Sequence, residues 1–207
     1  MSVCYIYGAM PTQFRPTLRP GDLVIAADAG LRQLGNIRPD LIVGDFDSLG
    51  YIPEGAEVIH HPVRKDDTDT LLAVRCGLER GYRNFVLLGG MGGRLDHTLA
   101  NLQTLQFIAA HGARGFLQGD EECATVIDNE TVTLAGKSGR VSVFALDKEV
   151  RGVWLTGLDY PLTDAVLTDQ FPLGVSNAFT GETAHIAAAG RLLLVWDGPY
   201  SLFEKRT

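Results

Sequence analysis

Short apolar runs alternate with amphipathic segments through roughly the first 120 residues. The apolar runs end in Gly- or Asp-rich turns, and helical periodicity follows in three segments, 31–36, 67–81 and 94–112. Continuous apolar strands followed by amphipathic helices are typical of a parallel sheet that is covered on both faces. The runs that we expect to form strands are VCYIYG, LVIAA, LIVG, EVIHHP and NFVLL. The pattern predicts a doubly wound, mostly parallel α/β domain over residues 1–120.

The pattern changes after residue 120. Residues 121–207 contain short β-rich runs, several of them alternating, and turn signals separate these runs without a convincing helix between them. This pattern predicts an antiparallel sandwich or barrel, and we expect a β-sandwich domain over residues 121–207. Within it, Trp154 in RGVWLTG is expected in the core.

Charge and hydropathy narrow the class of protein. The chain has 18 Lys and Arg against 25 Asp and Glu, so its formal net charge is −7, and no basic stripe occurs that would neutralise a phosphate backbone. No uncharged apolar run approaches the ~20 residues of a membrane helix, and the N-terminus lacks the features of a signal peptide. We therefore expect a cytoplasmic protein that binds neither nucleic acid nor membrane.

Aspartates follow the predicted strands of the first domain. In an open parallel sheet, ligands bind beyond the carboxyl ends of the strands, where these residues converge. Any one of them is more commonly a turn former or a helix N-cap. So many carboxylates in one crevice repel each other unless cations are present, which indicates a hard divalent metal, most simply Mg²⁺. The aspartates are Asp28, Asp45, Asp47, Asp66, Asp67, Asp69 and Asp96.

A glycine-rich turn, Gly89 to Arg94, lies between a predicted strand and a predicted helix. Glycines let backbone amides approach an anion, the helix N-terminus adds partial positive charge, and Arg94 offers a planar fork for phosphate oxygens. Glycines at a strand end also serve tight turns, so this motif alone is weak. Lys65 is a second candidate for phosphate binding, against the alternative of a surface lysine. The chain contains no GxxxxGK[ST] motif, which excludes a P-loop ATPase as a template.

Six motifs together resemble those of the thiamine pyrophosphokinase family, and the resemblance extends over nearly the whole chain. Combined, GDFDSL, KDDTD and GGRLDHTLAN are far more specific than any one of them. The matching pieces are AADAG (26–30), PDLIVGDFDSL (39–49), KDDTDT (65–70), GGMGGRLDHTLANL (89–102), GLDYPL (157–162) and GVSNAFTG (174–181).

The resemblance implies an activity and a set of roles. Family members have an α/β domain followed by a β-sandwich, act as homodimers, and transfer the pyrophosphoryl group of ATP to the hydroxyl of thiamine, giving thiamine diphosphate and AMP. By analogy, Arg94 stabilises the transferring group, Asp96 supports the metal or orients Arg94, and one of the aspartates accepts the hydroxyl proton. The residues that would arrange Mg²⁺ and the triphosphate are Asp45, Asp47, Asp66 and Asp69. For His97, capping of the helix is an equal alternative to ligand contact. The residues expected to bind the cofactors, Mg²⁺ or ATP, are Asp28, Lys65, Asp66, Thr68, Gly92, Gly93 and His97.

The resemblance also implies a thiamine site in the second domain. Ser176 and Asn177 match the family's Ser-Asn pair near the aminopyrimidine. Trp196 stands where some members supply an aromatic ring that stacks on thiamine, and a core position in RLLLVW is an equal alternative. If the dimer is kept, one active site takes residues from two subunits at their interface.

Three other functions remain as alternatives. LIVGDFDS imitates the Asp-x-Asp of a haloacid-dehalogenase-type phosphatase, although two predicted strands precede it and the glycine motif would then be unexplained. A non-catalytic thiamine or nucleotide sensor would bind the same ligands without turning ATP into AMP. A pyrophosphokinase with a pterin-like acceptor would share the donor motifs.

Overall fold

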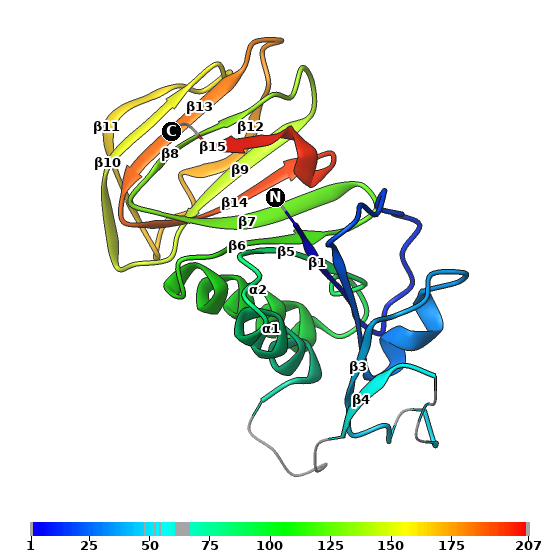
Figure 1. The fold of residues 1–207 in the computed structure, drawn as a ribbon. Helices are drawn as coiled ribbons and strands as arrows, with labels where there is room; N and C mark the ends of the chain where they lie inside the picture. Colours follow the sequence, from blue (N-terminus) through cyan, green and yellow to red (C-terminus); the bar gives the residue numbers. More distant parts are fainter. Residues whose placement is uncertain (1, 48, 52, 54, 61–66, 206–207) are drawn as a thin grey trace. The chain divides into compact units, whose positions relative to one another are not determined.

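The structure is a computed structural model that describes residues 2–47, 49–51, 53, 55–60 and 67–205 (Figure 1). It divides into two compact units, residues 1–120 and 121–207. Within the described part, neither α-helix is long and apolar enough to cross a membrane.

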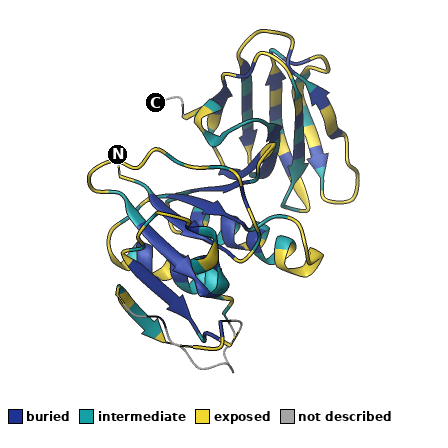
Figure 2. Ribbon diagram, turned by 90° about the vertical axis from the view of Figure 1, so that its right-hand side faces the viewer, coloured by how far each residue is buried: buried dark blue, intermediate teal, exposed yellow. Residues whose placement is uncertain are grey.

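The first unit is built on a parallel sheet whose strand order is β6-β5-β1-β2-β3-β4. β1 to β3 and β5 are mostly buried apolar runs, whereas β4, at the edge of the sheet, is only partly buried (Figure 2). The strands are β1 (Cys4–Tyr7), β2 (Leu23–Ala27), β3 (Leu41–Gly44), β4 (Glu57–His60), β5 (Asn84–Leu88) and β6 (Arg114–Gln118).

The chain winds in both directions along this sheet. From β1 it moves through β2 and β3 to β4, then crosses back to β5 and β6 on the other side of β1. Right-handed connections in opposite directions lie on opposite faces. α1 (Asp69–Glu79) and α2 (Leu95–Ala110) pack against each other on one face, and the 3₁₀-helix η1 (Asp28–Gln33) lies on the other (Figure 1). The predicted doubly wound α/β class is confirmed, and its direction reverses between β1 and β5.

The second unit consists of two antiparallel sheets. One has the order β12-β9-β14-β7, and the other has the order β11-β10-β13-β8-β15. The predicted β-sandwich class is confirmed. The first sheet contains β7 (Glu122–Asp128), β9 (Arg140–Ala145), β12 (Gly174–Ala178) and β14 (Arg191–Asp197). The second contains β8 (Thr131–Leu134), β10 (Glu149–Thr156), β11 (Leu162–Thr168), β13 (Ala184–Ala189) and β15 (Phe203–Lys205), which follows the short 3₁₀-helix η2 (Tyr200–Leu202).

The expectation that Trp154 lies in the core is wrong. Side chains alternate between the two faces of a strand, and Val153 and Leu155 are two of the buried positions of β10. Trp154 lies between them, so its side chain points to the outer face of the sheet and is 45% exposed.

Some elements differ from the sequence pattern. Residues 31–36 were expected to form a helix, but η1 ends at Gln33 as a single short 3₁₀ segment. β6 was not expected, because Gly115 interrupts its apolar run. In the structure this glycine lets α2 approach the sheet, since an added Cβ would lie 2.7 Å from Cδ1 of Ile108.

Candidate active site

Three carboxylates converge at the carboxyl edge of the parallel sheet. Asp28 follows β2, Asp45 follows β3, and Asp69 is the first residue of α1, the helix after β4. One carboxylate oxygen from each lies within 4.8 Å of the others. Three hard oxygen donors at this spacing are the ligands that Mg²⁺ prefers. The topology therefore brings together acids that are 41 positions apart in the sequence.

Asp28 is the most deeply placed of the three. Its residue is only 8% exposed, and its Oδ1 has no hydrogen-bond partner among the described residues. Its φ of 45° lies in the left-handed region, where non-glycine residues are uncommon. Residues with such strained backbone conformations often lie at functional sites. Gly44 at the end of β3 allows this placement, because a Cβ there would lie 3.0 Å from the Asp28 Cβ. A buried carboxylate oxygen without a partner is costly unless a cation or proton satisfies it, so this site fits a metal ion.

Asp45 and Asp47 flank a strained turn after β3. Phe46, between them, is buried with a φ of 60°, and its ring stacks on His60 at 5.7 Å between centroids. The Asp47 backbone N–H donates to Asp45 Oδ1 at 3.2 Å, which helps to orient that carboxylate. The Asp47 residue itself is exposed and lies outside the three-carboxylate group. Its role as a metal ligand stays a prediction.

The start of α1 holds Asp69 in place. Thr68 is the N-cap, and its Oγ1 accepts a hydrogen bond from the Leu71 N–H at 3.2 Å. Asp67, which precedes the N-cap, pairs with Arg75 of α1 at 2.9 Å, so its carboxylate is engaged in an ion pair with the helix. Thr68, which we expected to contact ATP, thus has a capping role in the structure. Lys65 and Asp66 lie outside the described residues.

Met10 and Asn101 pack closely against the glycine-rich loop between β5 and α2. Gly89 has a φ of 64°, and a Cβ there would lie 2.4 Å from the Met10 carbonyl oxygen. Asn101 of α2 is buried and donates from Nδ2 to the Gly90 carbonyl at 2.8 Å. Gly92 and Gly93 also have positive φ, and no atom of the described residues lies within 4 Å of a Cβ added at Gly92. The base of the loop is therefore fixed, and the described residues leave space at Gly92 for an anion to approach its backbone.

Arg94 and Asp96 form a bidentate ion pair at the start of α2. Arg94 Nε donates to Asp96 Oδ1 at 3.1 Å, and its Nη2 donates to Oδ2 at 2.5 Å. Hydrogen bonding from Arg94 lowers the pKa of Asp96, which also accepts the His97 N–H at 3.0 Å. Both side chains are largely exposed, so Asp96 orients a guanidinium that still faces solvent. The role of Asp96, in supporting the metal or in orienting Arg94, stays a prediction.

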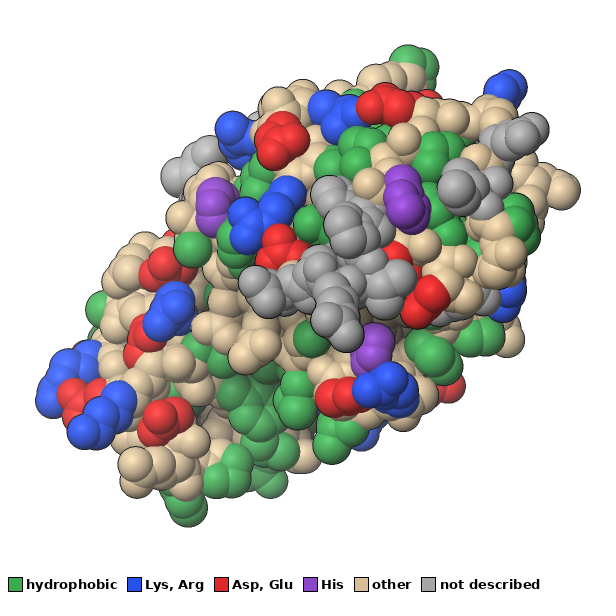
Figure 3. All heavy atoms as spheres, turned by 90° about the horizontal axis from the view of Figure 1, so that it is seen from below, with side chains coloured by type: hydrophobic (Ala, Val, Ile, Leu, Met, Phe, Trp, Pro, Cys, Tyr) green, Lys and Arg blue, Asp and Glu red, His purple; other side chains and the backbone are tan. Residues whose placement is uncertain are grey.

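Arg94 places positive charge beside this loop. On the face drawn in Figure 3, acidic side chains lie among basic ones. The chain is acidic overall, with a net charge of −7. A bound polyphosphate would therefore depend on a few directed groups and on a cation.

A pocket of about 490 Å³ lies in the second unit, beside the turn between β10 and β11. A volume of this size suits a small organic ligand. Its exposed aromatic side chain is that of Tyr160, 70% exposed. The other lining residues are Leu155, Asp159, Pro161, Leu162, Leu173, Gly174, Val175 and Asn177.

Asn177 fixes the backbone of Tyr160 at this pocket. Its Oδ1 accepts the Tyr160 N–H at 2.9 Å, and its Nδ2 donates to the Tyr160 carbonyl at 2.7 Å. The Asn177 side chain is buried, whereas neighbouring Ser176 is exposed with a φ of 59°. Asn177 therefore acts on this pocket through Tyr160, and Ser176 stays the more accessible of the pair.

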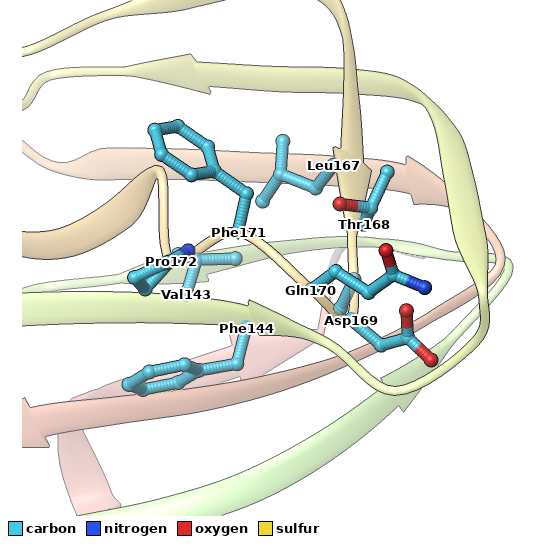
Figure 4. A pocket seen from close by; sticks show the side chains of 9 residues that line it. Val143, Phe144, Leu167, Thr168, Asp169, Gln170, Phe171 and Pro172 are labelled. Carbon is cyan, nitrogen blue, oxygen red and sulfur yellow. The ribbon is translucent and has the colours of Figure 1, made fainter.

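A second pocket in this unit is too small to bind a small organic ligand as the pocket at Tyr160 could. It measures about 120 Å³, with the rings of Phe144 and Phe171 at one end and the polar side chains of Asp169 and Gln170 at the other (Figure 4). Ligand pockets for drug-sized molecules are typically about 300 Å³ or larger. The pocket at Tyr160 is therefore the better candidate for an acceptor.

Family models match both units of the chain. Residues 14–116 match the thiamin pyrophosphokinase catalytic domain, and residues 128–193 match the thiamin pyrophosphokinase vitamin B1 binding domain. The chain belongs to the thiamin pyrophosphokinase family.

Individual members of the thiamin pyrophosphokinase family agree with this assignment. Thiamine pyrophosphokinase from Bacillus subtilis is 26% identical over 183 residues, which cover 84% of this chain and 86% of that protein. Thiamin pyrophosphokinase 1 from Caenorhabditis elegans is 39% identical over 75 residues, which span 32% of this chain and 30% of that protein. The crystal structure of the Bacillus subtilis enzyme shares the fold, with a TM-score of 0.84 at 23% identity over 95% of this chain and 99% of that one.

Trp196 is a core residue in the structure. This was one of the two roles that the sequence allowed in this thiamin pyrophosphokinase family member, the other being stacking on thiamine. The residue is 1% exposed, its Nε1 donates to the Pro199 carbonyl at 3.1 Å, and its ring stacks on Phe203 at 6.3 Å. A ring without an exposed face does not stack on a ligand. The expectation that Trp196 contacts thiamine is therefore not carried further.

Sequence reasoning overlooked two residues of the candidate sites. Tyr160 is the aromatic residue of the quoted motif GLDYPL, and Asn101 is the last residue of GGRLDHTLAN. Both belong to motifs that carried the family resemblance, so the signal was present. The sequence does not show that the Tyr160 side chain is exposed at a pocket or that the Asn101 side chain is buried against a loop.

Proposed function

We propose that this protein transfers the pyrophosphoryl group of ATP to the hydroxyl of thiamine, forming thiamine diphosphate and AMP. The observation that carries the proposal is the convergence of Asp28, Asp45 and Asp69 at the carboxyl edge of the sheet. The glycine-rich loop begins at the same edge, after β5. The family of the chain supports the same reaction. The carboxylates that would bind the metal and the loop that would bind phosphate then lie at the same edge of the parallel sheet, as such a transfer requires.

Asp28, Asp45 and Asp69 would hold Mg²⁺, with Asp47 and Asp66 as further candidate ligands. When bound, the ion neutralises phosphate charge and orients the triphosphate. The carboxylates of the chain hold that position in advance, because Gly44 and the Phe46 turn fix two of them before any ligand arrives.

The glycine-rich loop and Arg94 would bind the transferring group. The backbone N–H groups of Gly92 and Gly93 and the positive end of the α2 dipole would face the developing negative charge. Arg94, oriented by Asp96, offers two parallel donors to phosphate oxygens, and His97 follows in the same helical turn. The thiamine hydroxyl oxygen attacks the β-phosphorus as one of the aspartates accepts the hydroxyl proton. The bond from that phosphorus to the bridging oxygen breaks, and this oxygen leaves with AMP.

The pocket at Tyr160 would bind the acceptor. Thiamine is a cation with an apolar rim, and an exposed aromatic ring attracts such a cation through its face. Leu155, Leu162 and Val175 supply apolar lining, and Asn177 keeps the Tyr160 backbone in place. Ser176 remains a candidate polar contact.

Arg94→Lys tests the role of the loop. Lysine keeps the positive charge but loses the planar fork, so we expect kcat to fall by roughly tenfold or more without a change in melting temperature. The matched control is Arg140→Lys, because Arg140 makes a similar bidentate pair with Asp197 in the other unit. Equal activity of the two variants in steady-state assays would contradict a phosphate role for Arg94.

Tyr160→Ala tests the acceptor pocket. Loss of the ring is expected to raise the KM for thiamine roughly tenfold while the KM for ATP stays nearly constant. Tyr160→Phe keeps the ring and should stay close to the unsubstituted protein. A similar rise in both KM values, or no rise in either, would place the acceptor elsewhere.

We also propose that the working form is a homodimer whose active site takes residues from both subunits. The exposed side chains of Leu95 and Leu99, one turn apart on α2, support an apolar contact with another chain. Mixing the Asp45→Asn and Tyr160→Ala proteins distinguishes the arrangements. The assay uses equal amounts of the two proteins and a thiamine concentration far below the KM, where Tyr160→Ala alone keeps about a tenth of full activity. Heterodimers with sites shared between chains contain one intact site, so the mixture should reach about a quarter of full activity. A site within one chain would leave only the contribution of the Tyr160→Ala chains, about a twentieth of full activity.

Product analysis separates the proposed reaction from its alternatives. Incubation with ATP, Mg²⁺ and thiamine should give AMP and thiamine diphosphate by chromatography. A sensor would bind both ligands without forming AMP, and a phosphatase would trap a beryllofluoride mimic on Asp45. AMP formation with a pterin-like acceptor but not with thiamine would keep the donor chemistry and change the acceptor.

A further inference from the structure

A segment that follows β1, residues 8–15, crosses the carboxyl edge of the sheet and contacts the glycine-rich loop, η1 and the residue Asp120 after β6. At its start, the Gly8 N–H donates to the Leu88 carbonyl at 2.7 Å and the Met10 N–H donates to the Gly89 carbonyl at 3.1 Å. Gln33 of η1 donates from Nε2 to the Ala9 carbonyl at 3.0 Å. We call residues 8–15 the crossing segment. It lies where the winding of the sheet changes direction, between β1 and β5.

Met10 of the crossing segment packs against the glycine-rich loop. An added Cβ at Gly93 would lie 2.7 Å from the Met10 Sδ and 2.9 Å from its Cε. Gly93 has a φ of 65°, so its conformation is one that most residues would resist. The thioether therefore supports Gly93 directly, and a shift of Met10 would leave the loop without this support.

Asp120, just after β6, anchors the other end of the crossing segment. Its Oδ1 accepts three hydrogen bonds, from the Thr12 hydroxyl at 2.8 Å, the Gln13 N–H at 2.7 Å and the Phe14 N–H at 3.2 Å. Thr12 is buried, and Arg15 closes the turn by donating to the Thr12 and Phe14 carbonyls. The Thr12 hydroxyl, followed by the backbone donors, lowers the pKa of Asp120. One carboxylate oxygen thus fixes three consecutive residues of an otherwise irregular segment.

We propose that Asp120 is a positioning residue for the phosphate-binding loop: by holding residues 12–14 it places Met10 beneath Gly93 and keeps residues 89–94 in their binding conformation. Asp120 itself touches no substrate in this scheme. The inference rests on the proposed function, because it assumes that the loop binds the ATP phosphates. Preorganised donors cost less to order at the moment of binding, so the effect should fall on ATP rather than on thiamine.

Asp22 provides a matched control. Its two carboxylate oxygens accept the Val3 N–H and the Arg19 N–H, each at 2.8 Å, so it also fixes a loop of the same unit. It does so beside the start of β2, at the opposite edge of the same sheet. Loss of Asp22 should lower stability through similar bonds without reaching the glycine-rich loop.

Three variants test the proposal: Asp120→Ala, Asp120→Asn and Asp22→Ala. We expect Asp120→Ala to raise the KM for ATP roughly tenfold with little change in the KM for thiamine, since three hydrogen bonds to one oxygen are lost. Asp120→Asn retains an oxygen at Oδ1 and should restore the KM for ATP to near its original value. Asp22→Ala should leave both KM values unchanged. Amide hydrogen exchange of the ligand-free proteins should be faster at the Met10 N–H, which donates to the Gly89 carbonyl, in Asp120→Ala alone.

The outcomes separate this inference from the proposed function. If the unsubstituted protein forms no thiamine diphosphate, the proposed function fails, and hydrogen exchange at the Met10 N–H still tests, without any substrate, whether Asp120 holds the crossing segment against the loop. Equal exchange at the Met10 N–H in all variants, or equal rises in both KM values, would overturn the positioning role. If Asp120→Ala does not fold, Thr12→Val, which removes only the hydroxyl, should raise the KM for ATP to a smaller extent than tenfold, and Thr12→Ser should not. An unchanged KM in Thr12→Val would overturn the proposal in that case.

Discussion

Asp45→Asn is expected to reduce kcat about a hundred- to thousandfold while leaving the fold intact, an effect comparable to removing other groups that stabilise charge in a transition state. Asp45 shares a group of three carboxylates with Asp28 and Asp69, and asparagine removes the negative charge from this group. The amide oxygen of asparagine still accepts the Asp47 N–H, so the turn after β3 should keep its shape. Steady-state kinetics and a melting curve measure the two expectations.

Asp40→Asn is the control for this substitution. Asp40 precedes the same strand, and its Oδ2 accepts the Val24 N–H at 2.8 Å at the opposite edge of the sheet. We expect this variant to keep its turnover, because its carboxylate takes no part in the three-carboxylate group. An Asp45→Asn protein that melts early but retains its specific activity would make Asp45 a structural residue.

Removal of divalent metal is expected to abolish turnover completely and reversibly. Without a cation, the carboxylates of Asp28, Asp45 and Asp69 would face the ATP tetra-anion unscreened. A second readout does not depend on activity. Mg²⁺ alone should raise the melting temperature of the unsubstituted protein, because it binds the folded state, and this rise should disappear in Asp28→Asn.

Two results would contradict a metal site at this position. One is full turnover in an excess of chelator. The other is an equal rise in melting temperature with Mg²⁺ in the unsubstituted and Asp28→Asn proteins, which would place the ion elsewhere. Asp28 is the informative position because its Oδ1 is buried and has no hydrogen-bond partner among the described residues.

The elements that the sequence predicted are those whose burial has a strong local signature. Buried strands such as β3 and β5 are continuous apolar runs, and α1 begins at an N-cap threonine. β6 was not predicted, since Gly115 weakens its pattern and is required only by the approach of Ile108 from α2. Its pairing with β5 depends on the sheet as a whole rather than on its own residues.

The candidate donor site was more predictable than the candidate acceptor site, and the reason is topological. Strand ends meet at one edge of a parallel sheet, so aspartates after β2 and β3 are close whatever the detailed packing. On an antiparallel sandwich, by contrast, a residue's exposure depends on the face to which it points. Trp196 and Tyr160 are both aromatic residues of the second unit, yet one is 1% and the other 70% exposed. This difference comes from tertiary packing, which the spacing of the residues does not reveal.

The most direct test of the proposed reaction follows the β-phosphorus of ATP. ATP labelled at the β-phosphorus is incubated with the protein, Mg²⁺ and thiamine, and the products are separated and counted. The account predicts that all transferred label appears in thiamine diphosphate, with an equal amount of unlabelled AMP, because the bond between the β-phosphorus and the AMP oxygen breaks. Label in ADP, with thiamine monophosphate as the other product, would show transfer of a single phosphoryl group and would contradict it.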